Sequence, residues 1–260
     1  PSAIKFNLIG KPAKWVSGKD VILHIIGMIG VDGALYRSME FVGEGIKNLS
    51  MDDRFTICNM AIEAGAKCAL FTPDEKTAEY CEIELNDYQK SLKGDEDAKY
   101  LCTITYRAED FVPVMACPSQ VDKIRDTSVL EGTPIDQVFI GSCTNGRLED
   151  LQAAAEVLKG KKVADYVKLI VTPASRKIYR QADEMGILDT LAEAGAIITH
   201  PGCGLCCGRT GGILTDGERV VATNNRNFLG RMGTSKVQIY LASPKTAASC
   251  AIAGKIVSPQ

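Results

Sequence analysis

The sequence predicts an α/β protein with two α/β/α domains and mainly parallel sheets. In the second half of the chain, five short apolar segments alternate with segments whose apolar residues recur at helical spacing. This alternation is typical of a parallel, doubly wound sheet with helices on both faces. The chain has 260 residues, and a domain usually takes roughly 100–200, so two compact units are favoured.

Composition and charge exclude several classes of protein. Apolar residues make up 45% of the chain, which excludes a disordered protein. Thirty basic residues against 32 acidic ones leave a net charge of −2, which argues against a dedicated nucleic-acid binder. No apolar run approaches the ~20 residues that span a bilayer, and the N-terminus has no signal-peptide pattern. Without an export signal, the ten cysteines indicate a reducing, cytoplasmic location.

Residues 1–125 form the first expected domain, an α/β unit that ends in a connector. Ser50 is placed to cap a helix whose first turn holds two acids, and Gly65 is placed to end it. The elements expected here are a helix at 19–26, a turn at 30–33 leading into 34–42, a helix at 50–64, a strand at 68–71, a helix opening at 73 and, in the connector from 91 onward, a strand at 101–106.

Residues 126–260 form the second expected domain and carry the regular alternation. Its expected strands lie at 138–140, 167–171, 196–199, 219–223 and 237–241, and its expected helices at 148–158, 175–185 and 187–194. Loops rich in small and polar residues follow three of these strands, at 141–146, 200–208 and 224–231. Ligands bind beyond the carboxyl ends of the strands in an open parallel sheet, so we expect the three loops to meet at one edge.

Three cysteines in these loops predict a metal centre. Cys203 and Cys206 form a C-x-x-C pair among glycines, and Cys143 lies in the first loop. Three thiolates suit an iron–sulfur cluster or zinc, and a site with three protein ligands keeps one metal position open for Lewis-acid catalysis. A structural zinc or electron-transfer module remains an alternative, with Cys207 or His200 as the fourth ligand; otherwise Cys207 is assigned to packing.

Two arginines in the third loop predict a binding site for carboxylates. Arg226 and Arg231 lie five residues apart among asparagine and glycine. A guanidinium group binds a carboxylate through two parallel hydrogen bonds, so this loop is suited to a polycarboxylate substrate.

Several separate motifs, in order along nearly the whole chain, resemble the aconitase superfamily. They are F-T-I-C-N-M at 55–60, G-S-C-T-N-G-R-L-E-D-L at 141–151, P-G-C-G-L-C-C-G at 201–208, N-R-N-F-L-G-R at 225–231 and Y-L-A-S-P-K-T-A-A at 240–248. Within the superfamily, the chain is most similar to the large subunits of the isopropylmalate dehydratases and of the related homoaconitases and dimethylmalate dehydratases. The resemblance implies an aconitase-like fold.

The resemblance also implies roles for individual residues. Cys143, Cys203 and Cys206 would hold one [4Fe–4S] cluster, with one iron lacking a protein ligand. The other positions that match family motifs are Arg226 and Arg231 as carboxylate binders, Asn225 and Asn145 as neighbours of the cluster, and Glu40 as a carboxylate near the open iron.

The activity implied is that of a hydro-lyase acting on a hydroxy di- or tricarboxylate, first of all the interconversion of 3- and 2-isopropylmalate in leucine biosynthesis. Homoaconitate and 2,3-dimethylmalate are the alternative substrates. In the family, an additional N-terminal region carries histidine and aspartate residues of the site, and a separate small subunit with a swivelling domain carries the serine base and the specificity loop. We therefore expect the 260 residues alone to hold the cluster without turning over substrate. A superfamily role in RNA binding by a cluster-free form gains little support from the net charge of −2.

Overall fold

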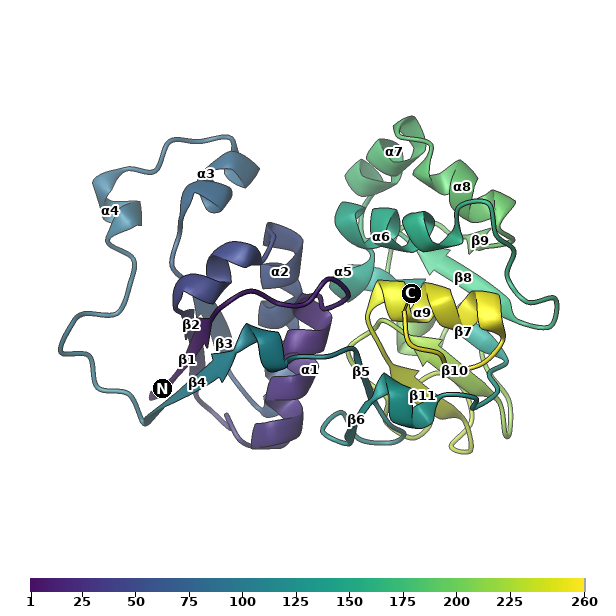
Figure 1. Ribbon diagram of the computed structural model, residues 1–260, viewed down its shortest axis with the longest axis horizontal. Helices are drawn as coiled ribbons and strands as arrows, with labels where there is room; N and C mark the ends of the chain where they lie inside the picture. The colour runs from purple at the N-terminus through teal and green to yellow at the C-terminus, as the bar shows by residue number, and fades with distance from the viewer. Residues whose placement is uncertain (260) are drawn as a thin grey trace.

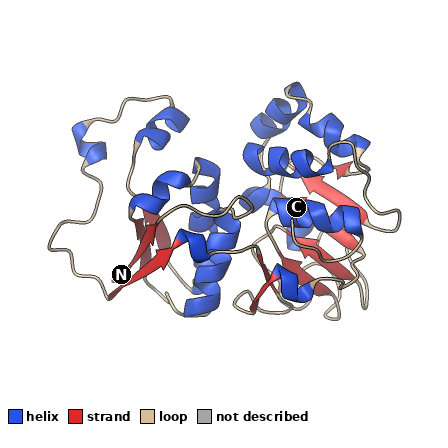
Figure 2. Ribbon diagram, in the orientation of Figure 1, coloured by secondary structure: helices blue, strands red, loops and turns tan. Residues whose placement is uncertain are grey.

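The computed structural model describes residues 1–259, which build two sheets (Figures 1 and 2). The first sheet has the strand order β3-β2-β1-β4, and all its neighbouring strands are parallel. Its strands are β1 (Ala3–Ile9), β2 (Ser38–Val42), β3 (Cys68–Phe71) and β4 (Cys102–Arg107).

The second sheet has the order β6-β5-β11-β10-β7-β8-β9, and only the pairs that involve β5 are antiparallel. Its strands are β5 (Val114–Ala116), β6 (Ile124–Asp126), β7 (Gln137–Gly141), β8 (Lys168–Thr172), β9 (Ile197–Ile198), β10 (Arg219–Ala222) and β11 (Gln238–Leu241). The predicted α/β class with mainly parallel sheets is confirmed.

Helices connect most of these strands. The α-helices are α1 (Gly18–Ile29), α2 (Met51–Met60), α3 (Glu75–Cys81), α4 (Asp87–Lys90), α5 (Ser142–Asn145), α6 (Leu148–Leu158), α7 (Arg176–Glu184), α8 (Ile187–Glu193) and α9 (Pro244–Ala253). Short 3-10 turns are η1 (Glu44–Asn48), η2 (Ala61–Ala64), η3 (Ala108–Asp110), η4 (Thr127–Leu130) and η5 (Gly204–Cys207). Within residues 1–259, no helix is long and apolar enough to cross a membrane.

Helix α1 lies between the two sheets and packs against both. Its residues from Val21 to Ile26 are buried on every side of the helix apart from His24, as expected for a helix enclosed by other elements. One hydrophobic core runs from Phe6 of the first sheet through α1 to Phe139 and Val220 of the second. The two sheets therefore share a core at the place where α1 and α2 approach the second sheet.

The layers differ between the two sheets. The second sheet is covered on both faces, because Val138 and Ile140 point into a core formed with α6, α8 and α9 while Phe139 points toward α1. In the first sheet, the alternation of buried and half-exposed residues along β1 and β2 leaves the face away from the helices partly open. Helices on both faces were expected of each sheet, and the second sheet alone has them over all its central strands.

Most expected elements lie within two residues of their expected bounds, and a few were not anticipated. Strand β1 and helix α9 were not foreseen, and the connector holds β5 and β6, which pair with the second sheet. The chain passes from the first sheet to the second between β4 and β5, ahead of the boundary expected at residue 126. The division into domains at that residue stays a prediction.

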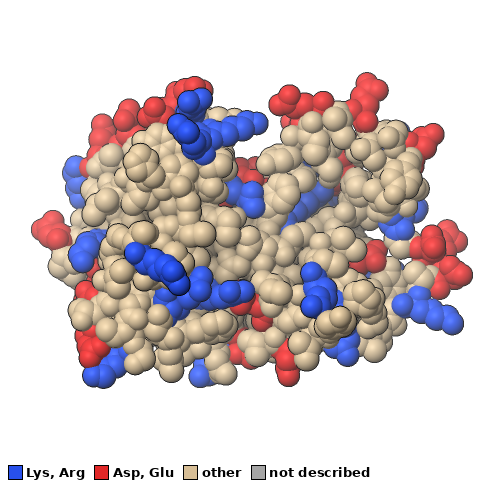
Figure 3. Space-filling model, turned by 180° about the vertical axis from the view of Figure 1, so that it is seen from behind, with Lys and Arg blue, Asp and Glu red and all other residues tan. Residues whose placement is uncertain are grey.

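On the face seen in Figure 3, acidic side chains lie along parts of the upper rim. Over the rest of this face, basic and acidic side chains are mixed. This face offers no continuous basic surface of the kind that binds a nucleic-acid backbone.

Candidate functional site

Three loops that follow strands of the second sheet form the site. They lie next to α2, which belongs to the first unit, that is, to the elements around the first sheet. Figure 1 shows α5, which carries Cys143, between α2 and the second sheet. The hydroxyl of Thr56 in α2 donates to the carbonyl oxygen of Thr144 at 3.0 Å, which ties α5 to α2. The site therefore contains residues from both units, the elements around the first sheet and those around the second.

The turn that carries Cys143 is tightly constrained. Gly141 has a φ of 144° and Ser142 a φ of 69°, and the second value is unusual for a residue with a side chain. A Cβ at position 141 would collide with the backbone of Thr172, so only glycine fits there. Strain of this kind is typical of functional turns that the surrounding structure holds in place.

The Cys203 thiol lies within electrostatic reach of the three other loop cysteines. Partial desolvation raises its pKa, and the charges of Cys206, Cys143 and Cys207 raise it further, in that order. Cys206 is 7% exposed, whereas Cys143 and Cys203 are exposed. The Cys207 thiol donates to the carbonyl oxygen of Gly204 at 3.4 Å within its own turn, which accords with packing.

Two asparagines connect Cys143 to the third loop. The side-chain amide of Asn59, at the end of α2, donates to the Cys143 sulfur at 3.5 Å. Asn225 donates to the Asn59 side-chain oxygen at 2.5 Å and accepts a hydrogen bond from the Thr144 hydroxyl. Asn225, one of the residues predicted to lie near the cluster, thus reaches Cys143 through Asn59.

The predicted carboxylate binder Arg226 is held by a buried acid. Its Nε donates to Oε1 of Glu63 at 2.7 Å, and the side chains are 37% and 4% exposed respectively. Burial raises the pKa of Glu63, while the hydrogen bond and charge of Arg226 oppose that rise. Within residues 1–259, the two terminal nitrogens of Arg226 have no hydrogen-bond partner, so both are free for a carboxylate. Arg226 lines a groove of about 830 Å³ whose walls include Ile62 and Phe228 and none of the site cysteines.

Arg231 lies against the cysteine turn. Its Nε donates to the carbonyl oxygen of Cys206 at 2.7 Å, and its Nη2 is 3.8 Å from the Cys206 sulfur. The guanidinium group therefore places a positive charge beside a predicted ligand.

Glu40 and Asn145, two of the predicted site residues, form their hydrogen bonds away from the cysteines. Glu40, on β2, accepts a hydrogen bond from the Tyr100 hydroxyl at 2.5 Å and one from the Gly94 amide at 3.4 Å. These partners lie in the long loop on the outer side of the first sheet (Figure 1). Asn145 is buried and donates to Thr56 and Asp150 at 3.2 and 3.0 Å, which anchors α5 to its neighbours. Neither residue has a hydrogen bond to the cysteines or to the third loop.

Sequence reasoning missed three residues of the site: Asn59, Glu63 and Lys19. Asn59 lies in the last turn of α2 and Glu63 in η2, which follows directly, so both belong to the end of the helical segment expected at 50–64. A polar residue and an acid beside its apolar face were a usable signal. Lys19 is fully buried near the start of α1, and its ammonium group donates to the carbonyl oxygens of Thr223 and Asn224 at 2.8 and 2.7 Å. A lysine in the first turn of a helix opposes the helix dipole, which was the available signal.

The three predicted ligands are all thiols, which suit an iron–sulfur cluster. Within residues 1–259, no three His, Cys, Asp or Glu side chains are arranged as ligands of one metal ion, so the convergence of Cys143, Cys203 and Cys206 on one centre stays a prediction. In a [4Fe–4S] cluster each thiolate binds a different iron, so the sulfurs need not converge on one point. Asn59 and Arg231 bring N–H groups to the sulfurs of Cys143 and Cys206, and such hydrogen bonds are typical of cluster ligands.

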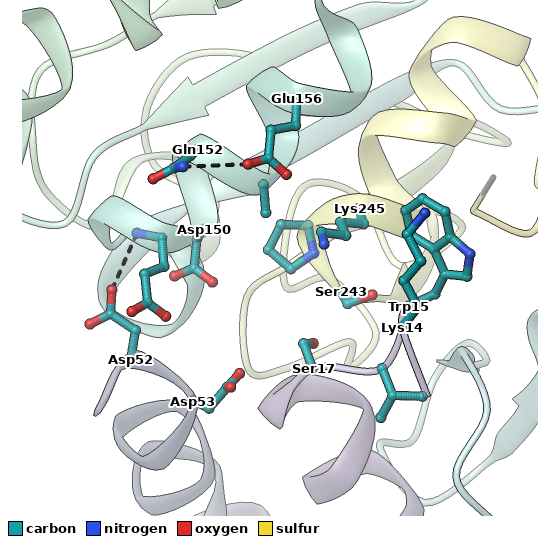
Figure 4. Close-up of a pocket in the computed structure, with 14 residues that line it drawn as sticks. Lys14, Trp15, Ser17, Asp52, Asp53, Asp150, Gln152, Glu156, Ser243 and Lys245 are labelled. Atoms are coloured by element: carbon teal, nitrogen blue, oxygen red, sulfur yellow. Dashed lines mark hydrogen bonds between the residues drawn. The ribbon is translucent and has the colours of Figure 1, made fainter. Parts of the chain in front are cut away.

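A second cavity, of about 310 Å³, lies beside this site between α1, α2, α6 and α9 (Figure 4). Asp52, Asp53 and Asp150 line one side, and Lys14 and Lys245 line the other. It contains none of the site cysteines or arginines. The cysteine loops therefore remain the candidate functional site.

The chain is similar to several known proteins. The sequence model of the aconitase family (aconitate hydratase) matches residues 1–129 and 119–254. A 3-isopropylmalate dehydratase large subunit of Acetivibrio thermocellus is 56% identical over 259 residues, and one of Clostridium kluyveri is 55% identical over 260 residues. Each match covers 100% of this chain and 62% of the relative. Among solved structures, aconitase X of Thermococcus kodakaraensis in its holo-form aligns with a TM-score of 0.46 and 18% identity, over 87% of this chain and 49% of that one.

Proposed function

The chain belongs to the aconitase family, and on this premise we propose that it is the cluster-binding large subunit of an iron–sulfur hydro-lyase. We infer that the substrate pair is 3-isopropylmalate and 2-isopropylmalate, in leucine biosynthesis. The relatives at 55–56% identity along the whole chain support this choice through their names. The chain spans 62% of their length, so the activity is proposed for the assembled enzyme.

Cys143, Cys203 and Cys206 are the proposed ligands of a [4Fe–4S] cluster. The observation that supports this proposal is that hydrogen bonds join the three loops: the hydroxyl of Thr144, next to Cys143, donates to Asn225, and Arg231 donates to the carbonyl oxygen of Cys206. When bound, the cluster supplies a Lewis-acidic iron without a protein ligand, which polarises the substrate hydroxyl. Exposed iron and thiolates are easily oxidised, so a reducing compartment such as the cytoplasm suits this function.

Arg226 is proposed to bind a substrate carboxylate through its two free terminal nitrogens. Glu63 holds the guanidinium group through Nε, at 2.7 Å, and Arg226 lines the groove. Arg231, which is fixed by the Cys206 carbonyl oxygen, is proposed to bind a second carboxylate on the side of the cysteine turn. Two arginines held in this way orient a dicarboxylate before water leaves.

Glu63 is proposed as a further acid of the site. Because burial raises its pKa, Glu63 can hold a proton at a higher pH than an exposed glutamate, and it lies beside Arg226. The role of Glu40 near the open iron stays a prediction, and in the structure its carboxylate accepts a hydrogen bond from Tyr100. The base that removes the carbon-bound proton is proposed to be a serine of the small partner subunit, whose swivelling domain also carries the specificity loop.

The experiment uses the complete large subunit, loaded anaerobically with iron and sulfide and assembled with its small subunit. We expect about four irons per large subunit and interconversion of the isopropylmalates. Cys143→Ser, Cys203→Ser and Cys206→Ser should each lose iron and activity, whereas the control Cys207→Ser should keep both. Binding of one zinc in place of iron, or equal loss in the control, would contradict the proposal. Turnover of homoaconitate or 2,3-dimethylmalate instead of isopropylmalate would keep the cluster assignment and overturn the substrate assignment.

A further inference from the structure

Lys19 joins the two units at the site. It is the second residue of α1, and its ammonium group reaches across to the loop that follows β10. There it donates to the carbonyl oxygen of Thr223 at 2.8 Å and to that of Asn224 at 2.7 Å. These two carbonyls directly precede Asn225 and Arg226 in the chain. A side chain from the first unit thus holds the backbone of the substrate-binding loop in the second.

Folding alone does not favour a lysine at this position. A positive charge near the start of a helix opposes the helix dipole, and a fully buried charge loses its hydration. Burial lowers the pKa of Lys19 to about 7, although the charges of Asp150, Cys206, Asp20 and Glu63 raise it in part. Within residues 1–259, no carboxylate forms an ion pair with its ammonium group. An apolar side chain of similar length would avoid these costs.

A chain of hydrogen bonds leads from Lys19 to the carboxylate-binding group. Lys19 fixes the Asn224 carbonyl, and the Asn224 side chain donates to the backbone oxygen of Arg226 at 3.0 Å. Arg226 then donates from Nε to Glu63 at 2.7 Å. Both Thr223 and Asn224 are fully buried, so water cannot replace the ammonium group as their partner without a rearrangement of the loop. Moving Lys19 would therefore move Arg226.

We propose that Lys19 is a positioning residue, which acts through the carbonyl oxygens of Thr223 and Asn224 to hold Asn225 and Arg226 where they bind the substrate. This inference rests on the proposed function, because it takes Arg226 as the group that binds a substrate carboxylate.

The test compares Lys19→Met and Lys19→Arg with the wild type in the cluster-loaded enzyme assembled with its small subunit. Loss of a group that orients a binding residue typically changes affinity or activity by about 10–100-fold. We expect Lys19→Met to raise KM for 3-isopropylmalate by about that factor, with the iron content per chain retained, and Lys19→Arg to lie between the two. The matched control is Lys14→Met, which removes an exposed lysine five residues earlier and should leave KM unchanged.

Calorimetric titration of the same preparations with 3-isopropylmalate gives a readout that does not depend on turnover. A merely structural role would lower the amount of active enzyme and leave KM and the dissociation constant as in the wild type, and this result would overturn the inference. If Lys19→Met does not fold, Lys19→Gln, which keeps an N–H donor, decides by the same two constants. A wild type that holds no iron and binds no isopropylmalate would instead overturn the proposed function.

Discussion

Replacing Glu63 by glutamine tests which acid serves the site. The change keeps the shape of the side chain and an oxygen acceptor but removes the negative charge opposite Arg226. In the structure, Glu63 is 4% exposed and its Oε1 accepts from Nε of Arg226 at 2.7 Å, which is the only ion pair of either residue within 1–259. Glu40→Gln is the matched control, because sequence reasoning favoured Glu40 and the structure places its carboxylate on Tyr100.

The expected size of the effect follows from the kind of bond that is changed. A hydrogen bond to a charged group contributes about 1.5–3 kcal/mol, and a neutral one about 0.5–1.5 kcal/mol, so the exchange costs about 1 kcal/mol. Arg226 is 37% exposed, and water screens part of its charge, which keeps the estimate at this low end. About 1 kcal/mol corresponds to a roughly fivefold rise in KM. Glu63→Leu, which removes the acceptor as well, should raise KM further.

The assay is KM for 3-isopropylmalate across pH with the assembled, cluster-loaded enzyme. Because the pKa of Glu63 is raised, the wild type should lose the charge opposite Arg226 at a higher pH than an ordinary glutamate would. Its KM should therefore rise as the pH falls, whereas KM of Glu63→Gln should be high throughout and depend less on pH. A Glu63→Gln enzyme with wild-type KM, together with a defective Glu40→Gln enzyme, would refute this reasoning.

Two further predictions concern the fold around the site. Arg54 is 2% exposed and binds both oxygens of Asp74, at 2.7 and 2.6 Å. Arg54→Met should therefore lower the free energy of unfolding, measured in urea, by about 3 kcal/mol, which is the low end for a broken buried pair because water reaches Asp74. An unchanged urea midpoint would contradict this prediction. Burial raises the pKa of Asp20 from 3.8 to about 6, so the carboxyl group binds a proton more tightly in the folded state than in the unfolded state. The protonated carboxyl group therefore stabilises the fold below pH 3.8, and this stabilisation is lost as the pH rises through about 6. Asp20→Asn should flatten that part of the stability curve, and an equal slope in both proteins would contradict the assignment.

Local rules were sufficient for most elements because their signals lie within a few residues. Strand β3 and helix α6 begin and end at their expected residues, and α2 begins after Ser50, whose side chain accepts from the Asp53 amide. Helix α9 was missed because its buried residues are mostly alanine and threonine, which form no strong apolar stripe. Strands β5 and β6 were left in a connector because each has three residues, and the pairing of β5 with β11, on which β6 then pairs with β5, depends on distant sequence.

The site residues likewise fall into those that could be predicted from the sequence and those that depend on distant contacts. The strand order of a parallel sheet brings its carboxyl ends to one edge, so Cys143, Cys203 and Cys206 could be expected together from the rhythm of the chain. The pairing of Arg226 with Glu63 could not be predicted from the strand order. It depends on how the end of the α2 segment packs against a loop 163 positions away in sequence, and no local sequence pattern determines that packing.

Several residues that break local rules lie where the two units meet. Ser142 has a positive φ, and Lys19 is a cation buried in the first turn of a helix. Asp150, whose pKa burial raises to about 7, accepts a hydrogen bond from Asn145 of α5. A structure chosen for stability alone would avoid each of them. Other departures, such as the positive φ of Tyr36 and Glu82, lie elsewhere in the chain. At this junction a buried lysine, a buried acid and a positive φ occur together beside the cysteine loops, which supports the choice of candidate site. Residues that oppose the local preferences of their secondary structure, such as a lysine two residues after a helix N-cap, can therefore indicate a candidate site before any contact is known.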